Sequence, residues 1–431
     1  MTSAAARATS LLCHPGARCR RSVCTGGGGG GSFGSFMDGL VVASEVPPVF
    51  SVTAHKPIFV DRPDSAAAQL REIASSKEIA VDTEGASFHR FIDRVYLLQL
   101  STRDRTAIVD PLAVSAKTLA PLGAMLENPS VETVFHDADY DLRVLDRDYG
   151  FRPVRLFDTR IAAQLVGEPA IGLAALLEKY VGVKLAKEHQ KADWSQRPLP
   201  PAMLAYAAAD TRHLLDLRDA LERRLKESGR LAWAEEEFVR LEGLRWTGAA
   251  GSDADGYLRV KGAKGLPPRA LAAFRELHRW REGVAQRDDK APFRVIGNDA
   301  LLAASRALPL APADLPRIKE LPASLARRHG DALLAAVARA LALPERDLPR
   351  LERVARLPKD PNFDGRVERL KGVRNRFATE LGLDPGVLCG RTTLEAVARA
   401  RPNDRAGLTR VGELRRWQIQ VLGDALLEVL R

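Results

Sequence analysis

Residues 79–101 read IAVDTEGASFHRFIDRVYLLQLS, and this stretch decides the fold of the first half of the chain. It begins with an apolar run that predicts a buried strand, and residues 95–100 predict a second strand. Side chains two apart on a strand point to the same side, so Asp82 and Glu84 should face one way. A third apolar run at 106–109 completes a predicted three-stranded meander.

Two later segments add acidic residues of the same kind. Asp141 follows an apolar pair at the start of a predicted helix. Tyr206 and Asp210 are four apart in a helical stretch, so they share a face. Burying unpaired carboxylates together costs energy, and a hard divalent cation such as Mg²⁺ or Mn²⁺ removes that cost because it prefers oxygen ligands. Four carboxylates therefore predict a site for two divalent cations, which would clamp the attacking and leaving oxygens of a phosphodiester.

Each feature alone also has an ordinary explanation. An Asp-x-Glu at a strand end is usually solvated, and Asp141 sits in an acidic run that would suit an exposed helix face. The pair Tyr206 and Asp210 could lie on any helix surface. After Pro200 the pattern predicts one long helix that carries this pair and then an apolar stripe of leucines, at positions 214, 217, 221 and 225.

Taken together and in this order, the segments resemble the tyrosine-bearing branch of the DEDD exonuclease superfamily, as in ribonuclease D and the exosome-associated nuclear exonuclease. The resemblance covers about residues 55 to 240. It is carried by four stretches: AVDTEGASFHRFIDRVYLLQLS (80–101), VFHDADYDLRVLDRDYGFRPVRLFDTRIAAQLVG (134–167), AKEHQKADWSQRPLP (186–200) and LAYAAADTRHLLDL (204–217). It implies a ribonuclease H-like fold, which is a mixed sheet flanked by helices.

The resemblance also implies roles for individual residues. Asp82 and Glu84 match the first motif, Asp141 the second, and Tyr206 and Asp210 the third. The four carboxylates would bind the cations, with Asp82 bridging both. The phenol of Tyr206 stays protonated at neutral pH and would hold the attacking water.

The resemblance also marks other landmarks of the family. His136 is interpreted as a strand-end residue, with substrate contact as the alternative. Asp158 and the pair Asp193-Trp194 are expected to cap and pack. The segment 86–88 departs from the bulkier, more basic segment of many bacterial relatives, which leaves the contacts to the 3′ end open.

The second half of the chain differs in charge and in pattern. The net charge of +10 divides into +4 for residues 1–36, −5 for residues 37–240 and +11 for residues 241–431. The last part has no strand pattern and repeats itself with a period of 93 residues: GNDALLAASRALP at 297–309 aligns with GRTTLEAVARARP at 390–402. A duplicated helical module follows from this repeat.

The duplicated modules resemble tandem HRDC domains, which follow an α/β exonuclease domain in ribonuclease D. HRDC domains bind nucleic acid, and a basic surface suits a polyanionic substrate. The alternative is that the Arg-rich surface merely reflects a GC-rich genome. The candidate RNA contacts are Arg275, Arg279, Arg281, Lys371, Arg374 and Arg376. Trp280 and Trp417 are expected to pack between helices, with base stacking as the alternative.

These patterns predict four parts. A leader at residues 1–50 is followed by an exonuclease domain at 55–240 and by HRDC-like domains at 262–342 and 355–431. Residues 1–36 are rich in Gly and Arg and free of acid. They would be a transit peptide to an organelle, or translated non-coding sequence before a true start at Met37.

Several classes of protein are excluded or disfavoured. No apolar run reaches transmembrane length, so no membrane partner is expected. Cysteines 13, 19, 24 and 389 lack the spacing of a disulfide framework or a zinc site, which favours a reducing compartment, the cytoplasm, unless the leader directs the protein to an organelle. The segment around Lys261 and Lys264 lacks the phosphate-loop pattern, so no nucleotide cofactor is expected.

The sequence therefore predicts a monomeric, metal-dependent 3′→5′ exoribonuclease. It would release nucleoside 5′-monophosphates from RNA 3′ ends, with tRNA precursors and other stable RNAs as substrates. Two alternatives remain. One is a DNA-directed 3′→5′ exonuclease, since this chemistry ignores the 2′-hydroxyl unless the pocket reads it. The other is a catalytically inactive nucleic-acid-binding protein.

Overall fold

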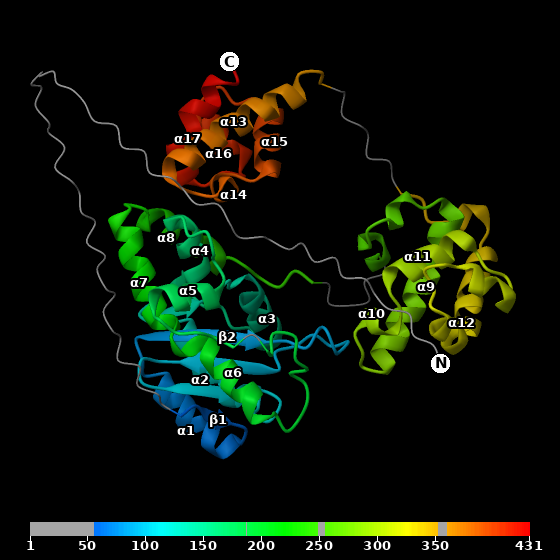
Figure 1. Cartoon of the computed structure of the whole chain (residues 1–431), viewed down its shortest axis with the longest axis horizontal. Coiled ribbons are helices and arrows are strands. Elements are labelled where there is room, and N and C mark those ends of the chain that lie inside the picture. Colours follow the sequence, from blue (N-terminus) through cyan, green and yellow to red (C-terminus); the bar gives the residue numbers. More distant parts are fainter. Residues whose placement is uncertain (1–55, 187, 249–254, 352–359) are drawn as a thin grey trace, which may run out of the picture. The chain divides into compact units, whose positions relative to one another are not determined.

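A computed structural model describes residues 56–431, apart from residue 187 and the segments 249–254 and 352–359 (Figure 1). The predictions made for the leader at residues 1–50, including a start at Met37, lie outside the described residues, as do cysteines 13, 19 and 24. Cys389 is described and is a buried free thiol. None of the described helices is long and apolar enough to cross a membrane.

The first part of the described chain is built on a six-stranded mixed sheet. The strand order is β1-β4-β3-β2-β5-β6, with β3 antiparallel to both of its neighbours and the other pairs parallel. The predicted meander is present as β2, β3 and β4. The strands are β1 (Ile58–Val60), β2 (Glu78–Glu84), β3 (Leu97–Ser101), β4 (Thr106–Val109), β5 (Glu132–Phe135) and β6 (Leu156–Asp158).

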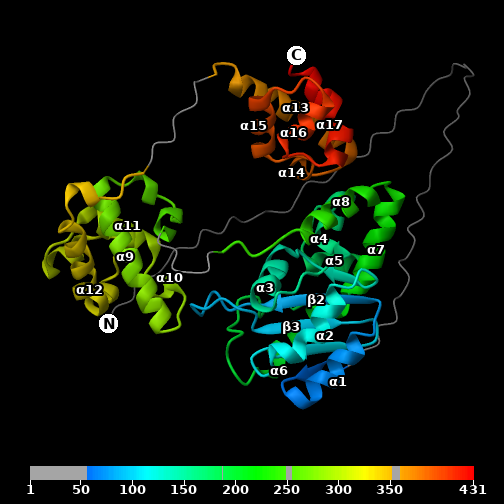
Figure 2. The same ribbon diagram turned by 180° about the vertical axis from the view of Figure 1, so that it is seen from behind.

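Helices flank this sheet, so the predicted ribonuclease H-like class is confirmed. Helix α6 crosses one face of the sheet (Figure 1), and α2 and α3 lie in front of the sheet in the reverse view (Figure 2). The helices of this part are α1 (Pro63–Ile73), α2 (Ala116–Leu126), α3 (Asp139–Tyr149), α4 (Thr159–Val166), α5 (Leu173–Tyr180), α6 (Pro201–Arg212), α7 (Leu214–Glu227) and α8 (Leu231–Glu242).

The prediction of one long helix after Pro200 was wrong, because two helices occupy that stretch. The break is at His213, whose backbone (φ −111°, ψ 12°) leaves the helical region. Helix α6 carries Tyr206 and Asp210 and packs on β2, β3 and β4, whereas α7 carries the apolar stripe and packs on α4 and α5. The break contains no Gly or Pro, so local sequence does not mark it. Tertiary packing separates the catalytic face from the core face.

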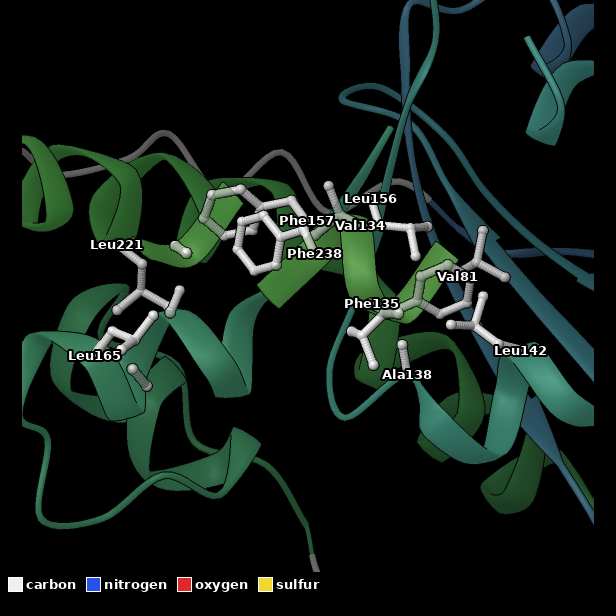
Figure 3. Packing of buried hydrophobic residues seen from close by; sticks show 14 of the residues in the cluster. Val81, Val134, Phe135, Ala138, Leu142, Leu156, Phe157, Leu165, Leu221 and Phe238 are labelled. Atoms are coloured by element: carbon white, nitrogen blue, oxygen red, sulfur yellow. The ribbon is translucent and has the colours of Figure 1, made fainter. Parts of the chain in front are cut away.

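The core behind the site is apolar and well filled. Val81 of β2 and Phe135 of β5 have no exposed surface, and Leu142 of α3 is 3% exposed. Figure 3 shows these side chains gathered with Ala138, so α3 is anchored to the centre of the sheet one residue after Asp141. Burial of such side chains contributes roughly 1.5–3 kcal/mol each, which makes this face of the sheet a rigid base for the site.

The remainder of the described chain is helical. The first module contains η1 (Gly256–Arg259), η2 (Ala263–Gly265), α9 (Pro268–Arg287), α10 (Pro292–Val295), α11 (Asn298–Ala307), η3 (Pro312–Arg317), α12 (Ala323–Leu341) and η4 (Glu345–Asp347). The second contains α13 (Phe363–Leu381), α14 (Pro385–Leu388), α15 (Arg391–Ala400), α16 (Arg405–Val411) and α17 (Arg416–Glu428).

The internal repeat holds in the backbone as well as in the sequence. Helices α10, α11 and α12 of the first module begin 93 residues before α14, α15 and α17 of the second. Even an unusual backbone position is shared, because Leu308 and Arg401 both end a helix with φ of +47°. A non-glycine residue with positive φ is uncommon, so its recurrence at the same place supports duplication of one module.

Candidate active site

The candidate active site lies where the end of β2 meets α6. Asp82 and Glu84 occupy alternate positions of β2, so their side chains leave the same face of the sheet, as predicted. Helix α6 begins with Pro201 at its first turn and crosses that region, with Tyr206 and Asp210 one turn apart. Two short elements therefore deliver four of the five predicted catalytic side chains.

Three of these carboxylates meet closely enough to share a cation. One oxygen each from Asp82, Glu84 and Asp210 can be chosen so that all three lie within 4.8 Å of one another. All three side chains are partly buried, and none forms an ion pair with a Lys or Arg of the described residues. A set of carboxylate oxygens with no organic counter-charge is what a hard divalent cation binds, so the residues fit such ions.

Asp141 lies beside this group and not within it. It is 5% exposed, in the first turn of α3, and its Oδ1 accepts a hydrogen bond of 2.5 Å from the Thr83 hydroxyl. Burial, followed by the negative charge of Asp82, raises the pKa of Asp141 above its ordinary value. The structure thus brings Asp82, Glu84 and Asp210 together and holds Asp141 next to them by a separate contact.

The electrostatics of the cluster reflect burial and crowding of like charges. Burial raises the pKa of Asp82 to about 6. Burial, followed by the charge of Asp82, raises the pKa of Asp210 to about 8. Burial and the charges of Asp82, Asp210 and Asp141 raise the pKa of Glu84 to about 10. Without a cation the cluster therefore retains protons at neutral pH, and cation binding must release them.

A cavity of about 430 Å³ opens beside the cluster. Asp82, Tyr206 and Asp210 line it, and the N-terminal end of α5 and residues of the segment before α6 form other walls. Glu84 and Asp141 are not among the lining residues. A space of this volume is in the range of small-molecule pockets and would accept a nucleotide-sized group.

Arg197 helps to hold the segment that precedes α6 against the sheet. Arg197 forms a two-pronged ion pair with the buried Asp110, at 2.5 and 2.9 Å, and also donates to the carbonyl of Tyr96 at 2.9 Å. Asp193 accepts hydrogen bonds from the backbone and side chain of Ser195. The expectation that Asp193 has a structural role is confirmed.

Tyr206 is surrounded by residues of that same segment. Its ring lies 6.2 Å from that of Trp194, which is 1% exposed, and 5.8 Å from that of His189 in an edge-on arrangement. Burial and the charge of Asp210 raise the pKa of the Tyr206 phenol, and Gln190 forms a hydrogen bond with it. The phenol remains protonated at neutral pH, as the sequence predicted.

Sequence reasoning did not single out His189 and Gln190 as neighbours of the site. Both lie in the stretch 186–200 that carried the family resemblance, but no charge or spacing pattern marked them. Their place depends on how the segment folds back from α5 to α6, which only the tertiary structure defines.

His136 lines the cavity beside Asp82, which is closer to the site than its interpretation as a strand-end residue implied. Burial lowers its pKa to about 4, so the ring is neutral at physiological pH, and Nδ1 lies 2.9 Å from the Thr159 hydroxyl. Asp158 caps α4 through the backbone N–H groups of Arg160 and Ile161, and it also accepts from the N–H of Ala138 at 2.8 Å. The predicted capping role of Asp158 is confirmed.

The six candidate RNA contacts of the helical modules differ in exposure. Arg281 is buried and bonds Asn298 and Glu282, so it stabilises its own module. Arg374 bonds the Cys389 carbonyl at 3.2 Å, and Arg275 contacts Glu276 at 3.5 Å. The side chains that extend into solvent are Arg279, Lys371 and Arg376.

The two tryptophans of the helical modules are packed. Trp417 is 2% exposed, and the Trp280 ring lies edge-on to His329 at 5.3 Å. This favours the packing interpretation over base stacking.

Fold and site together define a nuclease of the 3′→5′ exonuclease class with helical accessory modules. Family models agree: residues 57–226 match "3'-5' exonuclease", and residues 270–337 and 363–430 each match "HRDC domain".

Two relatives and one solved structure match large parts of the chain. Ribonuclease D of Pseudomonas paraeruginosa is 32% identical over 392 residues, which are 88% of this chain and 99% of that protein. The exosome complex exonuclease RRP6 of Saccharomyces cerevisiae is 36% identical over 260 residues, or 57% of this chain, and the match spans only 35% of the yeast protein. The structure of Escherichia coli RNase D superposes with a TM-score of 0.64 at 26% identity, over 87% of this chain and 99% of that one.

The chain belongs to the ribonuclease D family. The predicted combination of a tyrosine-type exonuclease domain and two HRDC domains is thereby confirmed.

Proposed function

We propose that this protein shortens RNA from its 3′ end and releases nucleoside 5′-monophosphates, using two divalent cations, Mg²⁺ or Mn²⁺, held by Asp82, Glu84, Asp141 and Asp210. As a member of the ribonuclease D family the chain is a 3′→5′ exoribonuclease. The main support for the metal site is the meeting of three carboxylate oxygens within 4.8 Å, beside a cavity that Tyr206 also lines.

The cations, when bound, supply Lewis-acid stabilisation of the charge that develops on the phosphodiester and on the departing 3′ oxygen. The chain's own residues hold the carboxylates that would bind these cations. Asp82 and Glu84 are fixed by the strand ladder, where Asp82 pairs with Gln99 and Glu84 with Leu97. Asp210 is fixed by α6, so the donor atoms need little rearrangement when a cation binds.

Tyr206 orients the attacking water. Its phenol is protonated and lies one helical turn before Asp210, so its hydroxyl can hydrogen-bond a water molecule at the edge of the carboxylate cluster. The rings of Trp194 and His189 and the Gln190 side chain limit its motion. A tyrosine held in this way would orient the attacking water. Its phenol is protonated and so would not be the base that takes the proton of that water.

We infer that structured stable RNAs, tRNA precursors among them, are the substrates, and that the protein acts as a monomer. The Escherichia coli relative is an exoribonuclease involved in structured RNA processing. The net charge of +11 over residues 241–431 suits a polyanion that extends beyond the nucleotide being removed.

The decisive experiment is digestion of a tRNA precursor with a 3′ extension, in Mg²⁺ and in EDTA, with products resolved to single nucleotides. A matched DNA oligonucleotide and the variant Asp210→Asn are run beside it. We expect stepwise shortening that needs the cation, stops near the mature end, and is absent in the variant. Degradation in EDTA would contradict the metal site, and equal degradation of DNA would make the enzyme a general 3′→5′ exonuclease.

A further inference from the structure

Thr83 lies between the two carboxylates of β2 and faces the other way. Because strand side chains alternate, Asp82 and Glu84 share one face and Thr83 points to the opposite one. There its hydroxyl donates a hydrogen bond of 2.5 Å to Oδ1 of Asp141, 58 residues further along the chain. The two side chains are 7% and 5% exposed, so water competes little for this bond.

Asp141 has few other means of holding its orientation. Among the described residues, Thr83 is the side chain that donates a hydrogen bond to its carboxylate. Its charged neighbours Asp82 and Asp158 carry the same sign and repel it. The backbone N–H of Asp141 itself also hydrogen-bonds this carboxylate, and Ala138, the residue before α3, provides no side-chain cap. A buried carboxylate in that position would rotate away from its neighbours unless a donor restrained it.

A neutral hydroxyl is well suited to this task. A Lys or Arg at position 83 would also bind Asp141, but it would cancel the negative charge that attracts a cation. The hydroxyl engages Oδ1, keeps the charge, and leaves Oδ2 available as a ligand atom. Hydrogen bonds from neighbouring groups orient metal ligands in this way, and their loss typically costs 10–100-fold in metal affinity or activity.

We propose that Thr83 is a positioning residue of the cation site, whose hydroxyl sets the Asp141 carboxylate in place beside Asp82, Glu84 and Asp210. One short segment of β2 then orients three carboxylates: two belong to it, and the third is held through Thr83. This inference rests on the proposed metal site, and it goes beyond it by assigning a function to the middle residue of the first motif.

The test compares four full-length proteins: the wild type, Thr83→Val, Thr83→Ser and Thr133→Val. Valine keeps the shape of threonine and removes the hydroxyl, whereas serine keeps the hydroxyl. Thr133 of β5 is a matched control, because its hydroxyl is also buried on the same sheet and has no hydrogen-bond partner among the described residues. Mn²⁺ binding to RNA-free protein is measured by calorimetry and by electron paramagnetic resonance, and RNA cleavage is measured against Mn²⁺ concentration.

We expect Thr83→Val to weaken Mn²⁺ binding about tenfold and to raise the Mn²⁺ concentration for half-maximal cleavage by a similar factor. Saturating Mn²⁺ should recover most of the rate. Thr83→Ser should stay within about threefold of the wild type, and Thr133→Val should bind Mn²⁺ as the wild type does. If circular dichroism shows that Thr83→Val is unfolded, Thr83→Ala replaces it in the same series.

Unchanged Mn²⁺ binding in a folded Thr83→Val protein would overturn the inference, as would a serine variant that is impaired as strongly as the valine variant. Equal impairment of Thr133→Val would show a general packing effect and would overturn it too. Failure of the wild type itself to bind Mn²⁺ would instead refute the proposed metal site, so the two failures are distinguishable.

Discussion

The carboxylate cluster of the exonuclease domain and the solvent-exposed cations of the helical modules handle charge in opposite ways. Asp82, Glu84 and Asp210 are gathered with no Lys or Arg partner among the described residues. In the helical modules each exposed candidate cation has an acidic neighbour on its own helix: Arg279 lies 3.0 Å from Glu276, Lys371 3.1 Å from Glu368, and Arg376 3.9 Å from Glu380.

The two regions therefore differ in the free-energy cost of their charges. Exposed ion pairs three or four residues apart contribute well under 1 kcal/mol and are easily exchanged for contacts with phosphate. A buried group of like charges destabilises the metal-free protein and makes a cation part of the folded site. The first arrangement suits loose contact with a long polyanion, and the second suits chemistry at one position.

The largest effect is expected from removing a carboxylate of the cluster. Asp82→Ala and Asp210→Ala should each lower turnover at least about a thousandfold, because the transition state loses its cation. RNA affinity, measured by fluorescence anisotropy, should change less than about threefold. Asp64→Ala, an exposed acid in the first turn of α1, is the control and should keep full activity. A purified Asp82→Ala or Asp210→Ala protein that still cleaves RNA would contradict a catalytic role of the cluster, which would then be structural.

Tyr206→Phe should have a smaller but large effect. The ring and its contacts with Trp194 and His189 are kept, so only the orientation of water is lost. We expect kcat to fall about 10²- to 10³-fold with little change in KM, measured under single-turnover conditions. A rise in KM with an unchanged kcat would instead place Tyr206 in substrate binding.

The stability of the metal-free protein should depend on pH in an unusual direction. The pKa values of Asp82, Asp210 and Glu84 are raised to about 6, 8 and 10, so the native state binds more protons than the unfolded state. The contribution of these three groups to the free energy of unfolding is fully present below about pH 4 and is lost as pH rises through 6 to 10. In EDTA, Glu84→Gln should therefore melt several degrees above the wild type at pH 8.5 and nearly with it at pH 4.5.

Addition of Mn²⁺ at pH 8.5 should make the wild type melt above Glu84→Gln. The cation binds the wild type more tightly than the variant, so it stabilises the wild type more. Thermal unfolding followed by circular dichroism at the two pH values measures both effects. Identical melting of the two proteins at pH 8.5 in EDTA would mean that burial and the neighbouring charges do not raise the pKa of Glu84 in solution.

The smallest effect is expected in the helical modules. The triple variant Arg279→Ala, Lys371→Ala and Arg376→Ala should weaken RNA binding about tenfold and reduce the salt dependence of binding, with kcat at saturating RNA unchanged. Arg410→Ala, an exposed arginine of the second module that lies 3.9 Å from Asp404, is the control. An unaltered salt dependence would show that the RNA takes another path.

The active-site residues were within reach of sequence reasoning because each is marked locally. Asp82 and Glu84 close an apolar strand, Tyr206 and Asp210 share a helical face, and the family pattern linked them to Asp141. The repeat of 93 residues was equally visible, since it needs only comparison of the chain with itself. Strand alternation and helical periodicity are local properties, and sequence carries them directly.

Other features needed the folded chain. The break at His213 has no Gly or Pro to mark it, and it follows from α6 and α7 packing on different neighbours. Burial of Arg281 against Asn298 and Glu282 removed one candidate RNA contact that composition alone could not distinguish from Arg279. Gln190 and His189 reach Tyr206 because the chain folds back between α5 and α6, in the segment that Arg197 helps to hold.

The sequence was enough to predict which residues carry the chemistry and to identify the class of fold and the duplication of the helical module, because these depend on residue type and short-range spacing. Tertiary structure alone decided that Asp82, Glu84 and Asp210 form one group, that Asp141 joins them through Thr83, and that His136 enters the cavity. Those arrangements depend on contacts between residues as far as 58 positions apart, as for Thr83 and Asp141, and only packing of the sheet against α3 and α6 brings such residues together.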